Sequence, residues 1–336
     1  MKKTLLPSTA FITTLFVLFF LVGWKKDNKT IRNRPFFTRQ LISDTYIAGT
    51  CTGGKIEISV WGDYIDGQTN VKTVSVDAGF VMVGGGAKIT NTLNTDVGVN
   101  SLLTAAYPVD NGLFTTYSGA SKSHQVQNLH RLWVYVIGMK IFPCNVNQCA
   151  GGSMNTSQII SNMKITSVTS SPAVSFPTIV VNPPAGYTFL SGGAFDHWSG
   201  QGNLLVGNGW QTSLAGDYTS GGKDCQVVST ATITGYCISI KLPLTCVLPV
   251  NLTITSKFNT ASIISALQSI TVTADPGNLI AGVSGLSTYV AGGQGRYLWA
   301  MAPTSTTAGI VSSKDHIQPD VNGTIGIGIT QIKPNF

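Results

Sequence analysis

The sequence is poor in charge, and glutamate is almost absent from it. Only 10% of the 336 residues are charged, and Glu57 is the one glutamate, whereas charged residues make up about 25% of an average globular protein. Helix surfaces usually draw on Glu and Lys, so a surface rich in Gly, Ser, Thr and Asn favours strands and turns. The scarcity of carboxylates also argues against a glycosidase, which needs two carboxyl groups with different pKa values.

Common catalytic and metal-binding motifs are missing as well. The sequence contains no Gly-x-Ser-x-Gly nucleophile turn, no His-Glu-x-x-His zinc motif and no Gly-x4-Gly-Lys-Ser/Thr phosphate loop. It has no Cys-x2-Cys pair, and its four histidines are scattered along the chain, which disfavours a zinc site. We therefore predict a protein that is not an enzyme, with no catalytic residues, no metal and no cofactor.

The net charge of +7 comes entirely from the N-terminal segment. Residues 1–39 hold eight basic residues and one acid, while the rest of the chain holds 13 basic and 13 acidic residues. A nucleic-acid-binding protein needs its basic residues on the folded surface that meets the phosphates. We expect no nucleic-acid partner.

Internal repetition is the strongest signal in the sequence. A Gly-rich run at residues 80–87 (FVMVGGGA) returns at 187–194 (YTFLSGGA) and, in a more divergent form, at 279–286 (LIAGVSGL). Each copy follows a β-branched run and a short turn, and each precedes a second apolar run, a lysine among small residues and an alternating strand. The same order of landmarks recurs three times, in segments of about 95 residues each, which indicates three copies of one structural unit.

We predict an all-β fold of three tandem β-sandwich-like repeats, at 51–144, 145–246 and 247–336. Short alternating runs, such as 56–60 (IEISV), are separated by Gly, Pro and Asn turns, as in sandwiches and barrels. The repeats either stand in a row, which we favour, or close around a pseudo-threefold axis as a β-prism. We expect the glycines of the Gly-rich runs to permit close packing against a neighbouring strand. One segment, 261–268, has a helix-like pattern.

The N-terminal residues 1–24 predict export. Two lysines precede an apolar run at 10–24, the arrangement of a signal peptide. Residues 21–28 (LVGWKKDN) resemble the lipobox of bacterial surface lipoproteins, in which Cys follows Leu-Val-Gly, but Trp24 stands in that place and offers no thiol for lipidation. The leader is either cleaved or retained as an anchor, and residues 25–50 are predicted to be a basic linker. We expect an extracellular or cell-surface location, with membrane contact only through the leader.

The cysteines suggest a disulfide framework. The chain has six of them, and an even number in an exported protein suits disulfide bonds. The pairs that fit the period of the repeats are Cys51 with Cys144 and Cys149 with Cys246, which leaves Cys225 and Cys237 to join each other within the second repeat. The alternative is a short bridge between Cys144 and Cys149.

Candidate binding residues lie in the lysine segments and near two tryptophans. They are Lys122, His124, Lys314, His316, Trp198, Trp210, His197 and Asn208. Lys and His can donate hydrogen bonds to a sugar or an acidic group, and indole rings can stack on a pyranose. The structural alternative is that these side chains cap turns or are partly buried. Trp133 and Trp299 lie in strand-like runs and are predicted to belong to the core.

Together these features predict an exported bacterial surface protein that acts as a binding module or adhesin. Its partner would be a glycan or another surface protein. The alternative is a structural subunit of a surface layer or fibre, in which copies of the chain associate with one another. A hydrolase with diverged catalytic loops is a third alternative.

Overall fold

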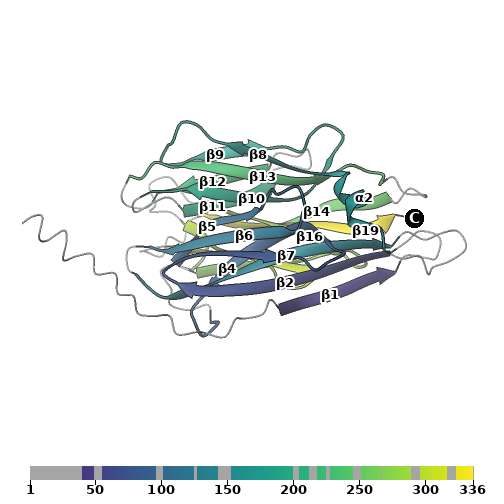
Figure 1. The fold of residues 1–336 in the computed structure, drawn as a ribbon. Coiled ribbons are helices and arrows are strands. Elements are labelled where there is room, and N and C mark those ends of the chain that lie inside the picture. Colours follow the sequence, from purple (N-terminus) through teal and green to yellow (C-terminus); the bar gives the residue numbers. More distant parts are fainter. Residues whose placement is uncertain are drawn as a thin grey trace, which may run out of the picture. The chain divides into compact units, whose positions relative to one another are not determined.

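Each repeat folds into six antiparallel strands. Repeat 1 contains β2 (Lys55–Gly67), β3 (Thr69–Ser75), β4 (Val81–Thr90), β5 (Ser101–Pro108), β6 (Thr116–Ser123) and β7 (His130–Phe142). Repeat 2 contains β8 (Met163–Thr169), β9 (Thr178–Val181), β10 (Thr188–His197), β11 (Leu204–Gln211), β12 (Tyr218–Lys223) and β13 (Thr232–Ile240). Repeat 3 contains β14 (Asn251–Ser262), β15 (Leu267–Thr273), β16 (Leu279–Ser287), β17 (Arg296–Pro303), β18 (Ala308–Asp315) and β19 (Thr324–Asn335). The predicted all-β fold is confirmed (Figure 1).

The computed structural model describes most of the chain from residue 40 onward. The described residues are 40–48, 55–95, 101–124, 127–142, 153–199, 204–211, 218–224, 228–244, 251–265, 267–288, 296–315 and 323–335, with the backbone alone at 40, 43–48, 210, 211 and 315. Residues 38–336 form one compact unit.

The six strands are connected in the same way in every repeat. The first, sixth and third strands form one half-sheet in that order, and the second, fifth and fourth strands form another. The half-sheets are β2-β7-β4 and β3-β6-β5 in repeat 1, β8-β13-β10 and β9-β12-β11 in repeat 2, and β14-β19-β16 and β15-β18-β17 in repeat 3. The two half-sheets of a repeat contact each other, so each repeat is sandwich-like. The three copies therefore share one topology, as the repetition predicted.

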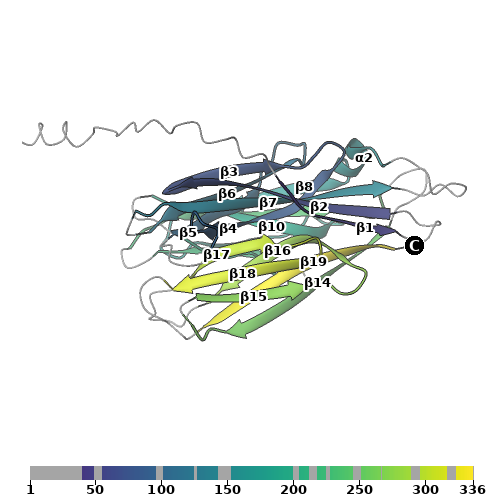
Figure 2. The ribbon, with the colours of Figure 1, turned by 90° about the horizontal axis from the view of Figure 1, so that it is seen from below.

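The sheets are completed between repeats, because the third strand of each repeat pairs with the fourth strand of another. β4 pairs with β17, β10 with β5, and β16 with β11, all antiparallel. Each sheet thus joins half-sheets of two repeats, and the three junctions form a closed circuit (Figures 1 and 2). This is the pseudo-threefold arrangement, and the predicted row of separate units is wrong. Alternating residues define the buried face of a strand but not the strand that lies beside it.

The Gly-rich strands carry an equivalent β-bulge in all three repeats. The register of β4, β10 and β16 shifts at Val83, Leu190 and Ala281, the residues skipped in the pairing with the sixth strand of each repeat. An extra residue of this kind bends the strand. Aligning the copies at the bulge makes Leu279 of the third copy equivalent to Val81 of the first, whereas the sequence match aligned Leu279 with Phe80.

The position after each bulge lies where the three repeats meet. It is Gly84 in repeat 1, Ser191 in repeat 2 and Gly282 in repeat 3. A Cβ atom on Gly84 would lie 2.2 Å from the carbonyl oxygen of Ala281 and 2.8 Å from Ser191 Oγ. A Cβ on Gly282 would lie 2.6 Å from both the Leu190 carbonyl oxygen and Ser191 Cβ. The prediction that these glycines permit close packing is confirmed, and only one of the three positions carries a side chain.

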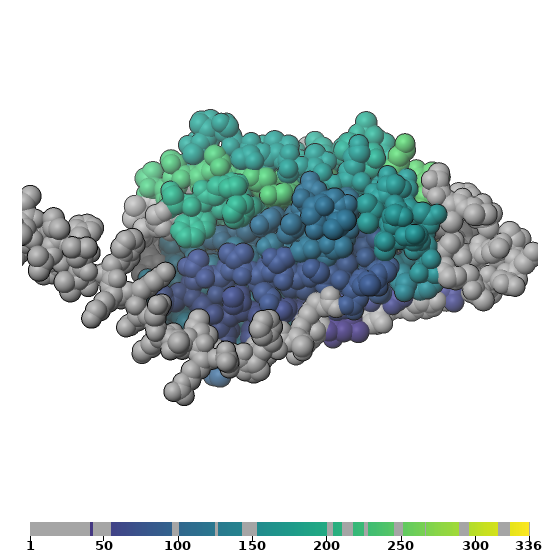
Figure 3. All heavy atoms as spheres, in the orientation of Figure 1, coloured from purple at the N-terminus to yellow at the C-terminus, as the bar shows by residue number. Residues whose placement is uncertain are grey.

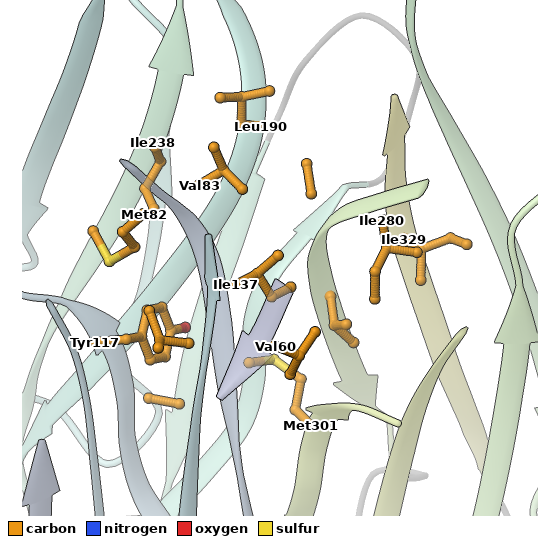
Figure 4. Close-up of a cluster of buried hydrophobic side chains, with 14 of the residues drawn as sticks. Val60, Met82, Val83, Tyr117, Ile137, Leu190, Ile238, Ile280, Met301 and Ile329 are labelled. Carbon is orange, nitrogen blue, oxygen red and sulfur yellow. The ribbon is translucent and has the colours of Figure 1, made fainter. Parts of the chain in front are cut away.

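One hydrophobic core draws on all three repeats. Figure 4 shows side chains from β2, β7, β10, β16 and β17 gathered in a single cluster, among them Val60, Ile137, Leu190, Ile280 and Met301. All five are fully buried. Burial of apolar surface contributes about 25 cal/mol per Å², and here that contribution depends on the repeats staying together.

Polar contacts also join the repeats. The Tyr117 hydroxyl of repeat 1 donates to the Gly192 carbonyl of repeat 2 at 3.1 Å. The Tyr297 hydroxyl of repeat 3 donates to the Asp224 carbonyl of repeat 2 at 2.7 Å. Because both hydroxyls are buried, losing either acceptor would leave a costly unpaired donor.

Two local predictions need correction. β1 (Gln40–Ala48) pairs with β2 over eight positions, so the folded unit includes part of the predicted linker 25–50. The helix-like segment 261–268 instead spans the end of β14 and the start of β15. The described helix, α2 (Thr156–Ile160), begins with a capping box in which Asn155 and Gln158 satisfy each other's backbone amides.

Cys237 is a free thiol, so its predicted bridge to Cys225 is wrong. It packs with Val181, Phe189 and Tyr218, and burial raises the pKa of its thiol to about 12. The remaining predicted disulfide partners lie outside the described residues, and their pairings stay predictions: Cys51, Cys144, Cys149 and Cys246.

Candidate ligand-binding site

The candidate site lies at the end of β10, where repeat 2 adjoins repeat 1. Repeats 1 and 2 form neighbouring parts of one molecular surface (Figure 3). Along this strand Phe195 is partly exposed, Asp196 is fully buried and His197 is exposed, because successive side chains of a strand point to opposite faces. The alternation therefore carries a carboxyl group into the interior.

Asp196 occupies a position that is not acidic in the other two repeats. The pairs Ala194–Ala106, Ala87–Met301 and Gly285–Asn208 are equivalent across the three junctions. Two residues further along each Gly-rich strand stand Asp196, Ile89 and Ser287. The fold itself therefore does not require a carboxylate at this position.

The Asp196 carboxyl group is buried without a hydrogen-bond partner. Neither of its oxygens receives a hydrogen bond within the described part of the chain. Burial raises the pKa of Asp196 to about 7, and the nearby charge of Lys122 acts in the opposite direction. Buried polar atoms are nearly always satisfied by protein, water or a ligand, so this unsatisfied carboxyl group is unusual.

Lys122 and Trp198 come from different repeats and meet beside Asp196. Lys122 lies in β6 of repeat 1 and is only 3% exposed. Its Nζ atom lies 4.1 Å from the centroid of the Trp198 ring, which follows β10 and is partly exposed. This is a cation–π contact. The structure thus brings together two residues predicted for binding, and His124 is buried two residues beyond Lys122.

The combination of groups suits a ligand rich in hydroxyls. A carboxylate can accept a hydrogen bond on each oxygen, an ammonium group can donate up to three, and an indole offers an apolar face. Hydrogen bonds to charged groups are stronger than those between neutral groups.

The other two lysine segments have different surroundings in the described residues. Lys223 Nζ donates to the carbonyl oxygen of Asp224 at 3.0 Å and lies 4.9 Å from the Phe176 ring. Lys314 is half-buried, and burial lowers its pKa. Ile89 and Ser287 take the place of Asp196 at the equivalent positions, so neither of these two positions carries a carboxylate.

Two further predicted residues have other roles. His197 lies on the opposite face of β10 from Asp196, with its Nε2 atom 2.7 Å from Thr234 Oγ1 and its ring edge-on to Phe195. Asn208 is buried, and its Nδ2 atom donates to the Ala106 carbonyl at 3.0 Å, which joins repeat 2 to repeat 1. The Trp210 side chain and His316 lie outside the described residues.

Of the two tryptophans predicted for the core, Trp133 and Trp299, only Trp299 is buried there. Trp133 is only partly buried, and its Nε1 atom donates to Asn94 Oδ1 at 3.1 Å, so its assignment to the core is wrong. Trp299 is 1% exposed, as predicted for a core residue. β7, the strand that holds Trp133, also carries Arg131, which donates to both carboxylate oxygens of Asp66 at 2.8 and 3.0 Å. This polar cluster is internally satisfied and is a weaker candidate for ligand binding.

Within the described ranges, no cluster of three or more His, Cys, Asp or Glu side chains could hold a metal ion. None of the helices in those ranges has the length and apolar character needed to cross a membrane. Comparison of the chain with protein-family models and with curated proteins gave no match.

Proposed function

We propose that this protein is an exported cell-surface binding protein that recognises glycans at the junction of repeats 1 and 2. The observation that supports the site is the buried, unsatisfied carboxyl group of Asp196 beside Lys122 and Trp198. Export is supported by the charged and apolar regions of residues 1–24. Asp196 accepts hydrogen bonds from sugar hydroxyls, Lys122 donates to sugar oxygens, and Trp198 covers an apolar sugar face.

Binding of the purified protein to a glycan panel tests this function. The variant Asp196→Ser removes the carboxylate and introduces the residue that repeat 3 carries at the same position. We expect it to weaken binding about 10- to 100-fold, because hydrogen bonds to charged groups contribute about 1.5–3 kcal/mol. Trp198→Ala should have a comparable effect.

The matched control is Trp133→Ala, which truncates a partly buried tryptophan outside the site. It should leave glycan affinity unchanged. Absence of saturable binding to any glycan, or equal losses in all three variants, would count against the proposed site.

A second candidate function, a structural subunit of a surface assembly, is favoured by one observation. β14 lies at the edge of its sheet without a pairing strand on its outer side within the described residues. Such an edge can pair with another chain.

A further inference from the structure

The edge strands of the three sheets are not protected equally. β2, β8 and β14 are the first strands of the three repeats and occupy equivalent positions in their half-sheets. β2 is covered by β1, while β8 and β14 end their sheets in the described structure. β8 has 7 residues and β14 has 12, so β14 offers the longer of the two edges (Figure 2).

The sequence of β14 does little to prevent pairing. Natural edge strands are usually blunted by proline, by several charges or by shortness. β14 contains no proline, and Lys257 is its one charged residue. The Lys257 Nζ atom already forms an ion pair with Asp275 at 2.7 Å. The backbone of this strand is therefore suited to accept a further strand.

The protein itself shows how an added strand is seated. β1 covers the equivalent edge of repeat 1 as an antiparallel strand that pairs with β2 at eight positions, with one register shift between Leu41 and Ser43. In repeat 3 no described segment of the chain has this role. The occupant that we infer is a second copy of the chain, because β14 is complementary to itself.

The self-complementarity follows from symmetry. Two identical antiparallel strands in one sheet are related by a two-fold axis perpendicular to the sheet, so opposed residues lie on the same face. A register centred on Ser256 places Ile254 of each copy opposite Phe258 of the other copy. Ile254 is half-buried and Phe258 is 36% exposed, and aromatic–aliphatic pairs across strands are favourable.

The same register keeps the positive charges apart. It places Lys257 opposite Thr255 of the second copy, whereas a register centred on Lys257 would place the two lysines opposite each other. Like charges directly opposed are destabilising. We propose that two copies of the protein associate through antiparallel pairing of their β14 edges, with Ser256 at the two-fold axis. This inference does not depend on the glycan site.

Cysteine cross-linking tests the register in the full-length protein. Ser256→Cys places two thiols at directly opposed positions, where Cα atoms are about 4.5–5.5 Å apart, within the range for a disulfide. Oxidation should give a covalent dimer on non-reducing gels. Thr255→Cys is the matched control, because its thiols would be two positions out of register and should cross-link poorly. Equal cross-linking of both variants, or of neither, would overturn the proposal.

Charge substitutions test the same contact without a new thiol. In this register, Thr255→Lys faces Lys257 of the second copy and should raise the dimer dissociation constant about tenfold, while Thr255→Glu should lower it by a similar factor. Analytical ultracentrifugation over a concentration series measures both. Thr73→Lys, on edge strand β3, is the control and should leave the constant unchanged. A monomer at all concentrations, or a dimer insensitive to both Thr255 changes, refutes the proposal.

Discussion

Gly84→Ala tests the close approach of the repeats at the pseudo-threefold axis. The added Cβ would lie 2.2 Å from the Ala281 carbonyl oxygen, a backbone atom of another repeat. Real Cβ atoms essentially never come closer than 3.0 Å, so the two strands would have to separate by about 0.8 Å. Replacing Ser191 with glycine cannot relieve this contact, because the carbonyl belongs to Ala281.

We expect Gly84→Ala to lower the free energy of unfolding by about 3 kcal/mol. Overpacking a well-packed core usually costs about 1–3 kcal/mol, and here the obstruction is backbone that belongs to two closed sheets. Urea unfolding, with the midpoint and the slope m fitted separately, gives the change in stability. An unchanged slope would show that the loss occurs without a change in the surface exposed on unfolding.

The matched control is Gly221→Ala, which changes a strand glycine in β12 of repeat 2. Its nearest contact would be Val206 Cγ2 at 3.4 Å, an ordinary van der Waals distance. Alanine also restricts the unfolded chain more than glycine does, so this variant should be unchanged or more stable by about 0.5 kcal/mol. If Gly84→Ala loses no more stability than Gly221→Ala, the proposed close packing at the axis is refuted.

Three further predictions concern ionisable and reactive groups. Burial raises the pKa of Asp196 to about 7 from its ordinary value of 3.8, so the folded state favours the protonated form. Stability should therefore fall as the pH rises from about 4 to about 7, by up to about 4 kcal/mol, and then level off. Asp196→Ser should abolish this fall in urea titrations, and a flat wild-type profile would contradict it. Cys237 should resist iodoacetamide until the protein unfolds, because burial raises its pKa to about 12; modification of the native protein, read by peptide mapping, would disprove this. Asp66→Asn should lower the free energy of unfolding by about 2 kcal/mol, because the partly buried Arg131 loses its charged acceptor; Asp63→Asn, whose Lys72 partner is more exposed, should lose less than about 1 kcal/mol.

The strands and the repetition could be predicted from sequence because both are local patterns. Alternation, turn residues and a recurring order of landmarks are all visible along the chain. The pairing between repeats is not local, since it depends on which edges meet. The glycines were the one sign of this pairing in the sequence. At Gly84 and Gly282 the absence of a side chain lets the backbone of another repeat approach closely. This sign was hard to read in the third copy, because its sequence matches the first copy one residue away from the structurally equivalent position.

The candidate site was predictable only in part. Lys122 and Trp198 stood out as a repeated lysine and as an indole beside a Gly-rich segment, and the structure places them together. Asp196 did not, because its significance appears only when Ile89 and Ser287 are placed at the same position. Trp133 was misassigned because it lies on the outer face of β7, between the buried residues Leu132 and Val134. An apolar run in the sequence does not by itself show which of its residues face outward.

The crowding at the axis has a consequence for how the three copies could diverge. A ring of three identical chains must carry the same residue at all three crowded positions, and contacts as short as those at Gly84 and Gly282 would exclude any side chain from them. Joining the copies into one polypeptide removes that constraint, so a hydroxymethyl group can occupy one position, at Ser191, while glycine keeps the other two. Because the three repeats can carry different residues, Asp196 can be acidic while Ile89 and Ser287 at the equivalent positions are neutral. One specialised site is therefore compatible with a nearly symmetric fold.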